Sequence, residues 1–349
     1  MIAPSGRYGS PKNLSISSLD FKEKKMNRRE FIGSVSAAAL MSSVLAEENA
    51  QGKPPQGKKA PGKKAPGKKA APHGKDAIAM WNHETELVPP KEYKAYLRDG
   101  NTRGFVSLEK LEKAFEKVMR EVKETTVTGS APAVWSVYNM GYIVKTRHSL
   151  FSIDLVHRRD AEFAPMLDFA IITHNHSDHW RQGFYEAMNG KGKTVISNFL
   201  DNYGVKNWKK DGGYIRGVKT FKIKDVEIRT SLIDHNNYLI DFTTAVEIKI
   251  GSFILYHTGD SGNGTESKLH TTWGRPDLWL FFPGCGIDTR KAVKKVNAKR
   301  IVFGHLWELG HAQNHRGRLD EPLIRPRLVW AKEAGCKDVS VKFWGDRIS

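Results

Sequence analysis

The residues most able to do chemistry lie together in the segment 174–179, which reads His-Asn-His-Ser-Asp-His. It supplies imidazole groups and one carboxylate, the side chains that bind zinc, manganese or iron in proteins. Each buried histidine must satisfy two ring nitrogens, so several histidines side by side would be costly as ordinary core residues. The segment therefore predicts a metal site. Its candidate ligands fit two adjacent ions better than one, and they are His174, His176, Asp178 and His179.

Three further candidate ligands, His235, Asp260 and His305, follow short apolar runs later in the chain. Strand ends from distant parts of a chain can meet at one edge of a sheet, which would bring these side chains to the first cluster. Asp260 can bridge two cations, because its negative charge offsets their mutual repulsion. The predicted chemistry is hydrolysis, in which a metal-bound hydroxide attacks a carbonyl or phosphoryl centre.

Residues near these ligands are candidates for supporting roles. Asp178 could orient the nucleophile or carry its proton in addition to binding metal. His311, six residues after His305, is a candidate to contact the substrate or to stabilise an oxyanion, or alternatively a surface histidine. Asp234 is expected to orient the ring of His235 through its other nitrogen, as metal-bound histidines commonly require.

Short strands and helices must position these groups. Residues 169–173 are typical of an apolar strand that runs directly into the histidine cluster, and 180–188 of a helix after it. Ser107 is a candidate N-cap of an earlier amphipathic helix. Further strands are predicted at 133–138, 142–145, 150–155, 194–197, 226–233, 244–250, 252–257, 278–282, 301–303 and 339–343, with a turn at 139–141 and helices at 290–296 and 323–334.

The predicted strands pair in hairpins early in the chain and alternate with helices later. This order favours an α/β sandwich with helices outside two sheets over a doubly wound parallel sheet. Two cysteines, Cys285 and Cys336, are too few for a disulfide framework, although they could pair in an oxidising compartment.

The order of these pieces resembles the metallo-β-lactamase superfamily. Its hallmark H-x-H-x-D-H follows a strand and precedes a lone His, a Gly-Asp pair and a final His. The resemblance covers roughly residues 134–334 and implies a four-layer αββα metallo-β-lactamase sandwich. It also implies two divalent metal ions, zinc or alternatively manganese or iron. One would be held by His174, His176 and His235 and the other by Asp178, His179 and His305, with Asp260 between them.

Within that superfamily the sequence departs from the true β-lactamases and from glyoxalase II, because residues 233–237 lack the Gly-His-Thr-Pro-Gly-His run. The segments 292–300, 304–307 and 320–322 look more like the branch that contains ascorbate-6-phosphate lactonase and N-acylphosphatidylethanolamine phospholipase D. That likeness implies a hydrolase for a phosphodiester, ester or lactone in a small-molecule or lipid-like substrate.

Residues 1–46 are interpreted as a targeting signal. Arg28 and Arg29 stand before an apolar stretch, residues 31–46, that is too short to span a bilayer well. The pattern resembles a twin-arginine signal, which implies export of a folded protein by that machinery to the periplasm or the outside. Met26, which directly precedes Asn27, Arg28 and Arg29, is then an alternative start. The alternative interpretation is a buried amphipathic helix.

Residues 47–75 are expected to be a disordered linker before a domain over 76–349. The linker repeats Gly-Lys-Lys-Ala-Pro and, from residue 51 onward, has no apolar residue larger than alanine, so it cannot offset the entropy cost of folding. It is interpreted as a solvated spacer or, alternatively, as a basic tether for anionic polymers.

The net charge of +18 is unevenly distributed. Residues 1–75 hold 15 Lys and Arg against 5 Asp and Glu, while the rest hold 41 against 33. The expected domain is therefore only mildly basic, so no specific nucleic-acid partner is expected and polyanion contact would be weak and through the linker. The rival interpretations are a nuclease of the same fold and a non-catalytic metal- or polyanion-binding protein.

Overall fold

The computed structural model describes residues 77–199, 217–310 and 320–349. The expected signal and linker lie outside these residues and stay predictions, and His311 also lies outside them. No helix within the described ranges is long and apolar enough to cross a membrane.

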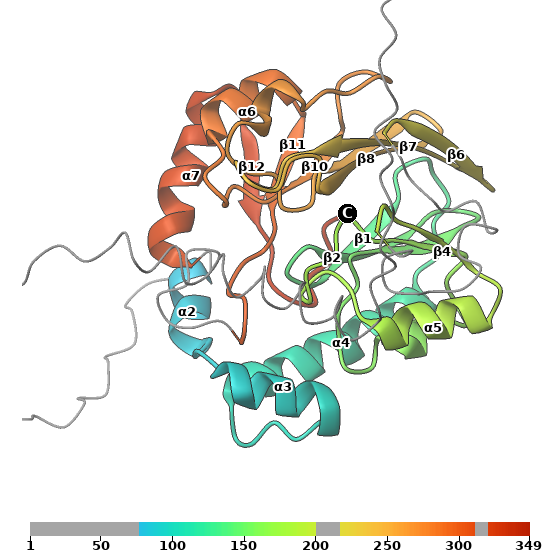
Figure 1. Cartoon of the computed structure of the whole chain (residues 1–349), viewed down its shortest axis with the longest axis vertical. Coiled ribbons are helices and arrows are strands. Elements are labelled where there is room, and N and C mark those ends of the chain that lie inside the picture. The colour runs from blue at the N-terminus through green and yellow to red at the C-terminus, as the bar shows by residue number, and fades with distance from the viewer. Residues whose placement is uncertain (1–76, 200–216, 311–319) are drawn as a thin grey trace, which may run out of the picture. The chain divides into compact units, whose positions relative to one another are not determined.

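Two β-sheets form the centre of the fold (Figure 1). Each begins with antiparallel hairpins and continues with parallel strands. The first sheet has the order β1 (Ala133–Tyr138), β2 (Gly141–Lys145), β3 (Leu150–Ile153), β4 (Phe169–Ile171) and β5 (Thr194–Ile196). The second runs in the order β12 (Asp338–Val341), β11 (Arg300–Phe303), β10 (Leu278–Phe281), β9 (Phe253–His257), β8 (Thr243–Ile250), β7 (Val226–Ile233) and β6 (Lys219–Ile223).

Helices cover the outer faces of both sheets. Figure 1 places α4 (Val106–Glu124) and α5 (Gln182–Gly190) outside the first sheet, and α6 (Thr289–Val296) and α7 (Glu321–Glu333) outside the second. The layers therefore run helix, sheet, sheet, helix. This confirms the four-layer αββα sandwich expected from the sequence.

Burial explains why the central strands have continuous apolar sequences. Every residue of β1, β4 and β10 is buried, because each of these strands has protein on both faces. The edge strand β6 instead alternates half-buried and exposed residues, with lysine at two of its five positions. Its mixed sequence is one reason why it was not expected.

Two N-terminal helices, α2 (Ala77–Glu84) and α3 (Pro90–Asp99), were also not expected from the sequence. In α2, the ring of Trp81 stacks on that of Phe343 with 4.6 Å between centroids. Asn82 Oδ1 accepts a hydrogen bond from Trp307 Nε1 at 3.0 Å. Because Trp307 follows His305 by two residues, α2 helps to fix a segment that carries a candidate ligand.

The expected N-cap role of Ser107 is wrong. Helix α4 starts at Val106 after Phe105, and Ser107 lies inside its first turn, where its hydroxyl donates to Glu86 O at 2.8 Å. Glu86 Oε1 accepts from the Val106 amide at 2.6 Å. A residue 20 positions earlier therefore closes this helix end, which a local capping pattern cannot reveal.

A buried histidine joins α3 and α4 to the loop that follows β3. His157 Nδ1 accepts from the Arg159 amide at 3.1 Å, and its Nε2 lies 3.0 Å from the Tyr96 hydroxyl oxygen. Tyr96 donates its proton to Glu112 at 2.7 Å, so its oxygen accepts from His157 Nε2–H. The neutral ring satisfies every partner, and burial lowers the pKa of His157 to about 3.

This arrangement predicts a loss of stability in mild acid. Because the pKa of His157 is 6.5 in the unfolded chain and about 3 in the fold, its contribution is complete above pH 6.5 and is lost as the pH falls toward 3. Between pH 8 and pH 5 the loss from this group is about 2 kcal/mol. Urea unfolding of the wild type and His157→Gln at both pH values measures it. Equal pH dependence in the two proteins would contradict the assignment.

Candidate metal centre

The loop 174–179 leaves the end of β4 and is tied to the second sheet. The Thr244 amide donates to Thr173 O at 2.9 Å, which joins the strand end of one sheet to β8 of the other. Gly259 approaches the same point with φ +47, and a Cβ there would lie 2.7 Å from Thr243 Cγ2 and 2.8 Å from Thr173 Oγ1. Glycine before Asp260 thus lets a second strand end come close to the histidine loop.

The structure brings all seven predicted ligands together. Within each of two groups, every residue offers one ligand atom within 4.8 Å of the others, and Asp260 belongs to both groups. This division matches the one implied by the resemblance to the superfamily. The groups are His174, His176, His235 and Asp260, and Asp178, His179, Asp260 and His305.

Asp260 lies between three imidazole rings. Its Oδ1 is 3.2 Å from His179 Nε2, and its Oδ2 is 3.6 Å from His235 Nε2 and 3.3 Å from His305 Nε2. The carboxylate therefore contacts rings from both groups, as a bridging ligand must.

The distances within each group are short. Asp178 Oδ2 lies 2.9 Å from His305 Nε2 and 3.2 Å from His179 Nε2. His174 Nε2 lies 3.2 Å from His176 Nδ1. Ligand atoms in each group therefore converge on a common point.

Several of these atoms have unmet bonding capacity. Among the described residues, His179 Nε2, His235 Nε2 and Asp260 Oδ1 are buried without a hydrogen-bond partner. Buried polar atoms are nearly always satisfied, because leaving one unpaired costs about 1–3 kcal/mol. A cation held by each group would satisfy these atoms, His235 Nε2 in the first, His179 Nε2 in the second and Asp260 Oδ1 between them, so the donor set fits metal binding.

The electrostatic field at the cluster favours positive charge. Burial opposes protonation of His179 and His305, yet Asp260 and neighbouring carboxylates raise the pKa of both rings well above the usual value. Burial likewise opposes ionisation of Asp178 and Asp260, but the nearby imidazolium charges hold both pKa values well below the usual range. A divalent ion would be stabilised by the same carboxylates.

The first group is suited to ligation by neutral imidazole. Burial lowers the pKa of His174 well below its usual value, and it lowers the pKa of His176 to about 4. Both rings are therefore unprotonated at neutral pH, the form in which histidine binds a metal.

Asp154 supports the cluster and was missed by the sequence analysis. It directly follows β3 with φ +45. Its Oδ1 accepts from the Thr173 amide at 2.7 Å, and its Oδ2 accepts from the Thr173 hydroxyl at 2.6 Å and lies 2.8 Å from His179 Nδ1. The carboxylate holds the ring so that Nε2 faces the cluster. The lone acidic residue in an otherwise apolar run was the available signal.

Glu308 is a second supporting carboxylate that was not expected. Its Oε2 lies 3.6 Å from His305 Nδ1, too long for a hydrogen bond but close enough to act by charge, and the residue is buried. The ring of Phe282 stacks on His305 with 4.2 Å between centroids. His305, at φ +59, is thus held from its far side and from one face.

The expected role of Asp234 is wrong. Its Oδ1 accepts from Lys268 Nζ at 2.6 Å and from the Asp241 amide at 2.9 Å, not from the ring of His235. His235 Nδ1 instead lies 3.5 Å from Asn236 Nδ2. Although Asp234 is next to His235 in the sequence, its carboxylate organises the loop that follows β7 and does not orient the ring.

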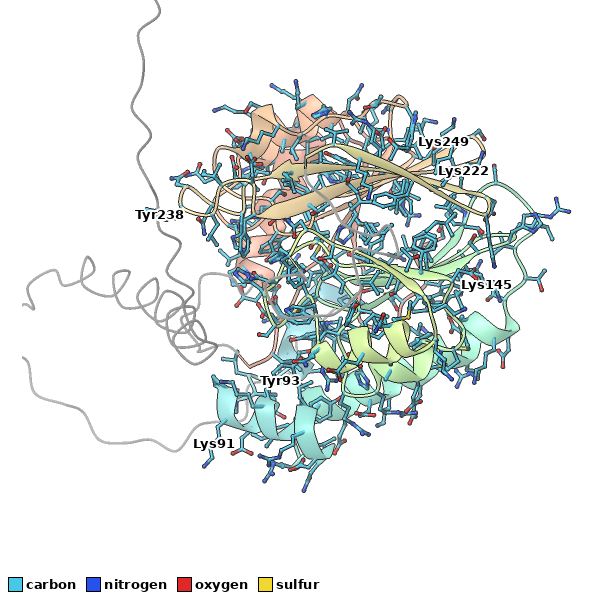
Figure 2. All side chains as sticks on the ribbon, turned by 45° about the vertical axis from the view of Figure 1, so that its right-hand side comes forward. Lys91, Tyr93, Lys145, Lys222, Tyr238 and Lys249 are labelled. Carbon is cyan, nitrogen blue, oxygen red and sulfur yellow. The ribbon has the colours of Figure 1, made fainter. Side chains whose placement is uncertain are left out.

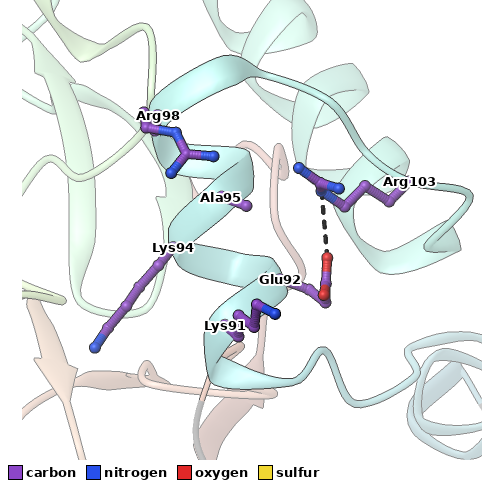
Figure 3. A pocket seen from close by; sticks show the side chains of 6 residues that line it. All are labelled: Lys91, Glu92, Lys94, Ala95, Arg98 and Arg103. Atoms are coloured by element: carbon purple, nitrogen blue, oxygen red, sulfur yellow. Dashed lines mark ion pairs between the residues drawn. The ribbon is translucent and has the colours of Figure 1, made fainter.

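Neither cysteine forms a disulfide, and Cys285 and Cys336 are free thiols. A pocket of about 520 Å³ lies on α3, away from the ligand cluster. Figure 3 shows its lining, in which Arg103 pairs with Glu92 at 3.2 Å. None of the seven candidate ligands lines this pocket, so it is not the candidate metal centre.

No family model matches the chain. A UPF0173 metal-dependent hydrolase of Ligilactobacillus salivarius is 25% identical over 146 residues, which cover 40% of this chain and 66% of that protein. A UPF0173 metal-dependent hydrolase of Caldivirga maquilingensis is 24% identical over 191 residues, covering 48% of this chain and 82% of that protein. The chain therefore spans just under two thirds of the first of these relatives.

A solved structure with a similar arrangement is that of Igni18, a metallo hydrolase from Ignicoccus hospitalis. The identity is 17%, the match covers 62% of this chain and 97% of that chain, and the TM-score is 0.48.

We expect Asp154→Asn to weaken binding of zinc about 10–100-fold, because an amide cannot accept from Thr173 and His179 at once and the ring loses its orientation. Titration with a competing chelator measures the affinity. The matched control is Asp168→Asn, since Asp168 binds the Leu150 amide and Lys224 away from the cluster. Wild-type affinity in Asp154→Asn would contradict the assigned role.

Proposed function

We propose that this chain is a metal-dependent hydrolase with a dinuclear centre. The observation that carries the proposal is the position of Asp260, whose carboxylate contacts His235 on one side and His179 and His305 on the other. A carboxylate shared by two groups of imidazoles is suited to two cations rather than one. The two relatives described as metal-dependent hydrolases support the same class.

In this proposal each group of residues holds one divalent ion, and Asp260 contacts both. Zinc fits the five imidazoles and two carboxylates, with manganese or iron as alternatives. Two such ions, when bound, lower the pKa of a water and polarise a carbonyl or phosphoryl oxygen. The assignment is His174, His176 and His235 to one ion and Asp178, His179 and His305 to the other.

The chain's own residues define the side from which a substrate approaches. His174 and His179 are buried, whereas His176 is half-buried and Ser177 is exposed. The side chain of Asp178 is 15% exposed, more than any carboxylate around it in the cluster. A substrate therefore reaches the cluster over the turn 175–178.

Asp178 is placed to act on a proton as well as to bind metal. Its pKa is held low by His179 and His305 against the effect of burial, so it remains a carboxylate at neutral pH. Asn139 Nδ2 donates to Asp178 Oδ2 at 3.3 Å and fixes the carboxylate from a third direction. An ionised, oriented and partly exposed carboxylate can accept a proton from a water at the site.

The proposed bond is a phosphodiester, ester or lactone in a small-molecule or lipid-like substrate. The tail motifs around His305 support this class by their likeness to the lactonase and phospholipase D branch. The proposal includes export to the periplasm or the outside by the twin-arginine machinery, on the strength of Arg28 and Arg29.

We expect Asp260→Ala and His176→Ala each to abolish turnover. Each variant should also bind less metal than the wild type, for which we propose about two ions per chain. Elemental analysis gives the metal content, and a panel of phosphodiesters, esters and lactones gives the activity. His270→Ala is the matched control, because His270 is exposed and its ring Nδ1 bonds the nearby Lys268 carbonyl, not a candidate ligand. Full activity with full metal content in Asp260→Ala would rule out the dinuclear centre.

A further inference from the structure

We propose that the loop 236–241, between β7 and β8, is a binding surface for an acyl chain of the substrate. Tyr238 and Ile240 are the contacting side chains. The inference rests on the proposed function, because the acyl chain would belong to a molecule held at the metal centre.

Tyr238 and Ile240 are exposed to an unusual degree for their size. Tyr238 is 92% exposed, more than any other large hydrophobic residue in the described ranges, and Ile240 is 57% exposed. Figure 2 shows Tyr238 projecting outward at the end of the ribbon loop. Isolated exposed apolar residues need no explanation, but two in one rigid loop beside a candidate active site do.

The turn that presents Tyr238 is fixed by its own hydrogen bonds. Asn236 Oδ1 accepts from the Tyr238 amide at 2.8 Å and from the Leu239 amide at 2.9 Å. The His235 amide donates to Leu239 O at 3.0 Å, so the turn closes on a residue that is a candidate metal ligand. None of these bonds uses the side chain of Tyr238, so they hold the turn in place whatever that side chain is.

The base of the loop is fixed by a second set of contacts. Lys268 Nζ binds Asp234 Oδ1 at 2.6 Å and Asp241 Oδ1 at 2.7 Å. Asp234 Oδ1 also accepts from the Asp241 amide at 2.9 Å. Both ends of the loop are therefore pinned, which lowers the cost of ordering its backbone on binding.

The loop lies directly beside the candidate metal ligands. It begins after His235 and ends before Phe242, whose ring centroid is 5.2 Å from that of His176 and 5.9 Å from that of His235. Tyr238 is three residues beyond His235, so their Cα atoms are at most about 11 Å apart. An extended acyl chain attached to an atom held at the metals can therefore reach Tyr238.

Local charge favours a substrate group over a membrane surface as the occupant. The loop base carries two carboxylates, Asp234 and Asp241, against the single ammonium of Lys268. This excess of negative charge would weaken contact with an anionic bilayer, and two apolar side chains are a small anchor for a whole protein. A tyrosine suits one apolar contact with its hydroxyl left in water.

The experiment compares the metal-loaded full chain with a Tyr238→Ser/Ile240→Ser double variant. Calorimetry measures binding of acetohydroxamate and octanohydroxamate, which share a metal-chelating group and differ in chain length. We expect the wild type to prefer octanohydroxamate and the double variant to lose about tenfold of that preference, the size expected for some 50 Å² of apolar contact. Val329→Ser, at a 51% exposed position of α7, is the matched control and should keep the wild-type preference.

An unchanged preference in the double variant would overturn the proposal. Co-sedimentation with phosphatidylcholine vesicles tests the membrane alternative: loss of vesicle binding with the hydroxamate preference intact would also overturn it. The measurement needs bound metal but no turnover. A protein that shows the preference yet hydrolyses no substrate would contradict only the proposed hydrolase function. An active enzyme without the preference would contradict only the proposed binding surface on the loop. A chain that binds neither metal nor hydroxamate would contradict both proposals.

Discussion

The carboxylate of Asp260 is the constraint on which the candidate site depends. It is almost fully buried, and an ion so far from water is stable only when positive charge or strong donors surround it. Rings of His179, His235 and His305 approach its two oxygens from both sides. Asp260 Oδ1 and the His179 Nε2 that faces it have no hydrogen-bond partner in the described chain. Positive charge on the rings of His179 and His305 meets part of this demand within the protein. The cations of the proposed centre would meet the rest and would also explain why so many ligands converge.

The rest of the fold can be understood as the means of bringing these ligands to one edge of the sandwich. The histidine loop leaves β4, and the later ligands leave β7, β9 and β11. Residues held at positive φ, Asp154 at +45 and His305 at +59, stand at this edge, and such conformations persist only where the surroundings over-determine them. The N-terminal helices add support from outside, since Asn82 binds Trp307 close to His305.

Much of the fold was accessible from the sequence because its central strands are buried on both faces and therefore have continuous apolar runs. The bounds of β1 and β7 agree with the expected ones, and the remaining expected strands agree to within two residues at each end. The sequence analysis missed α2, α3 and the edge strand β6. The cap of α4 was misassigned, because Glu86 reaches it through space.

The sequence by itself determined which residues could bind metal, because histidines and aspartates at this density are costly in a core without a shared cation. It also determined the division into two groups, through the resemblance carried by their order. Only the tertiary structure decided which carboxylates hold the rings. Asp154 and Glu308 support His179 and His305, whereas Asp234, next to His235, turns away to Lys268. The physical reason is that the ability to bind metal belongs to the side chain itself. The partner of a histidine's second ring nitrogen depends instead on which backbone segment folds beside the ring.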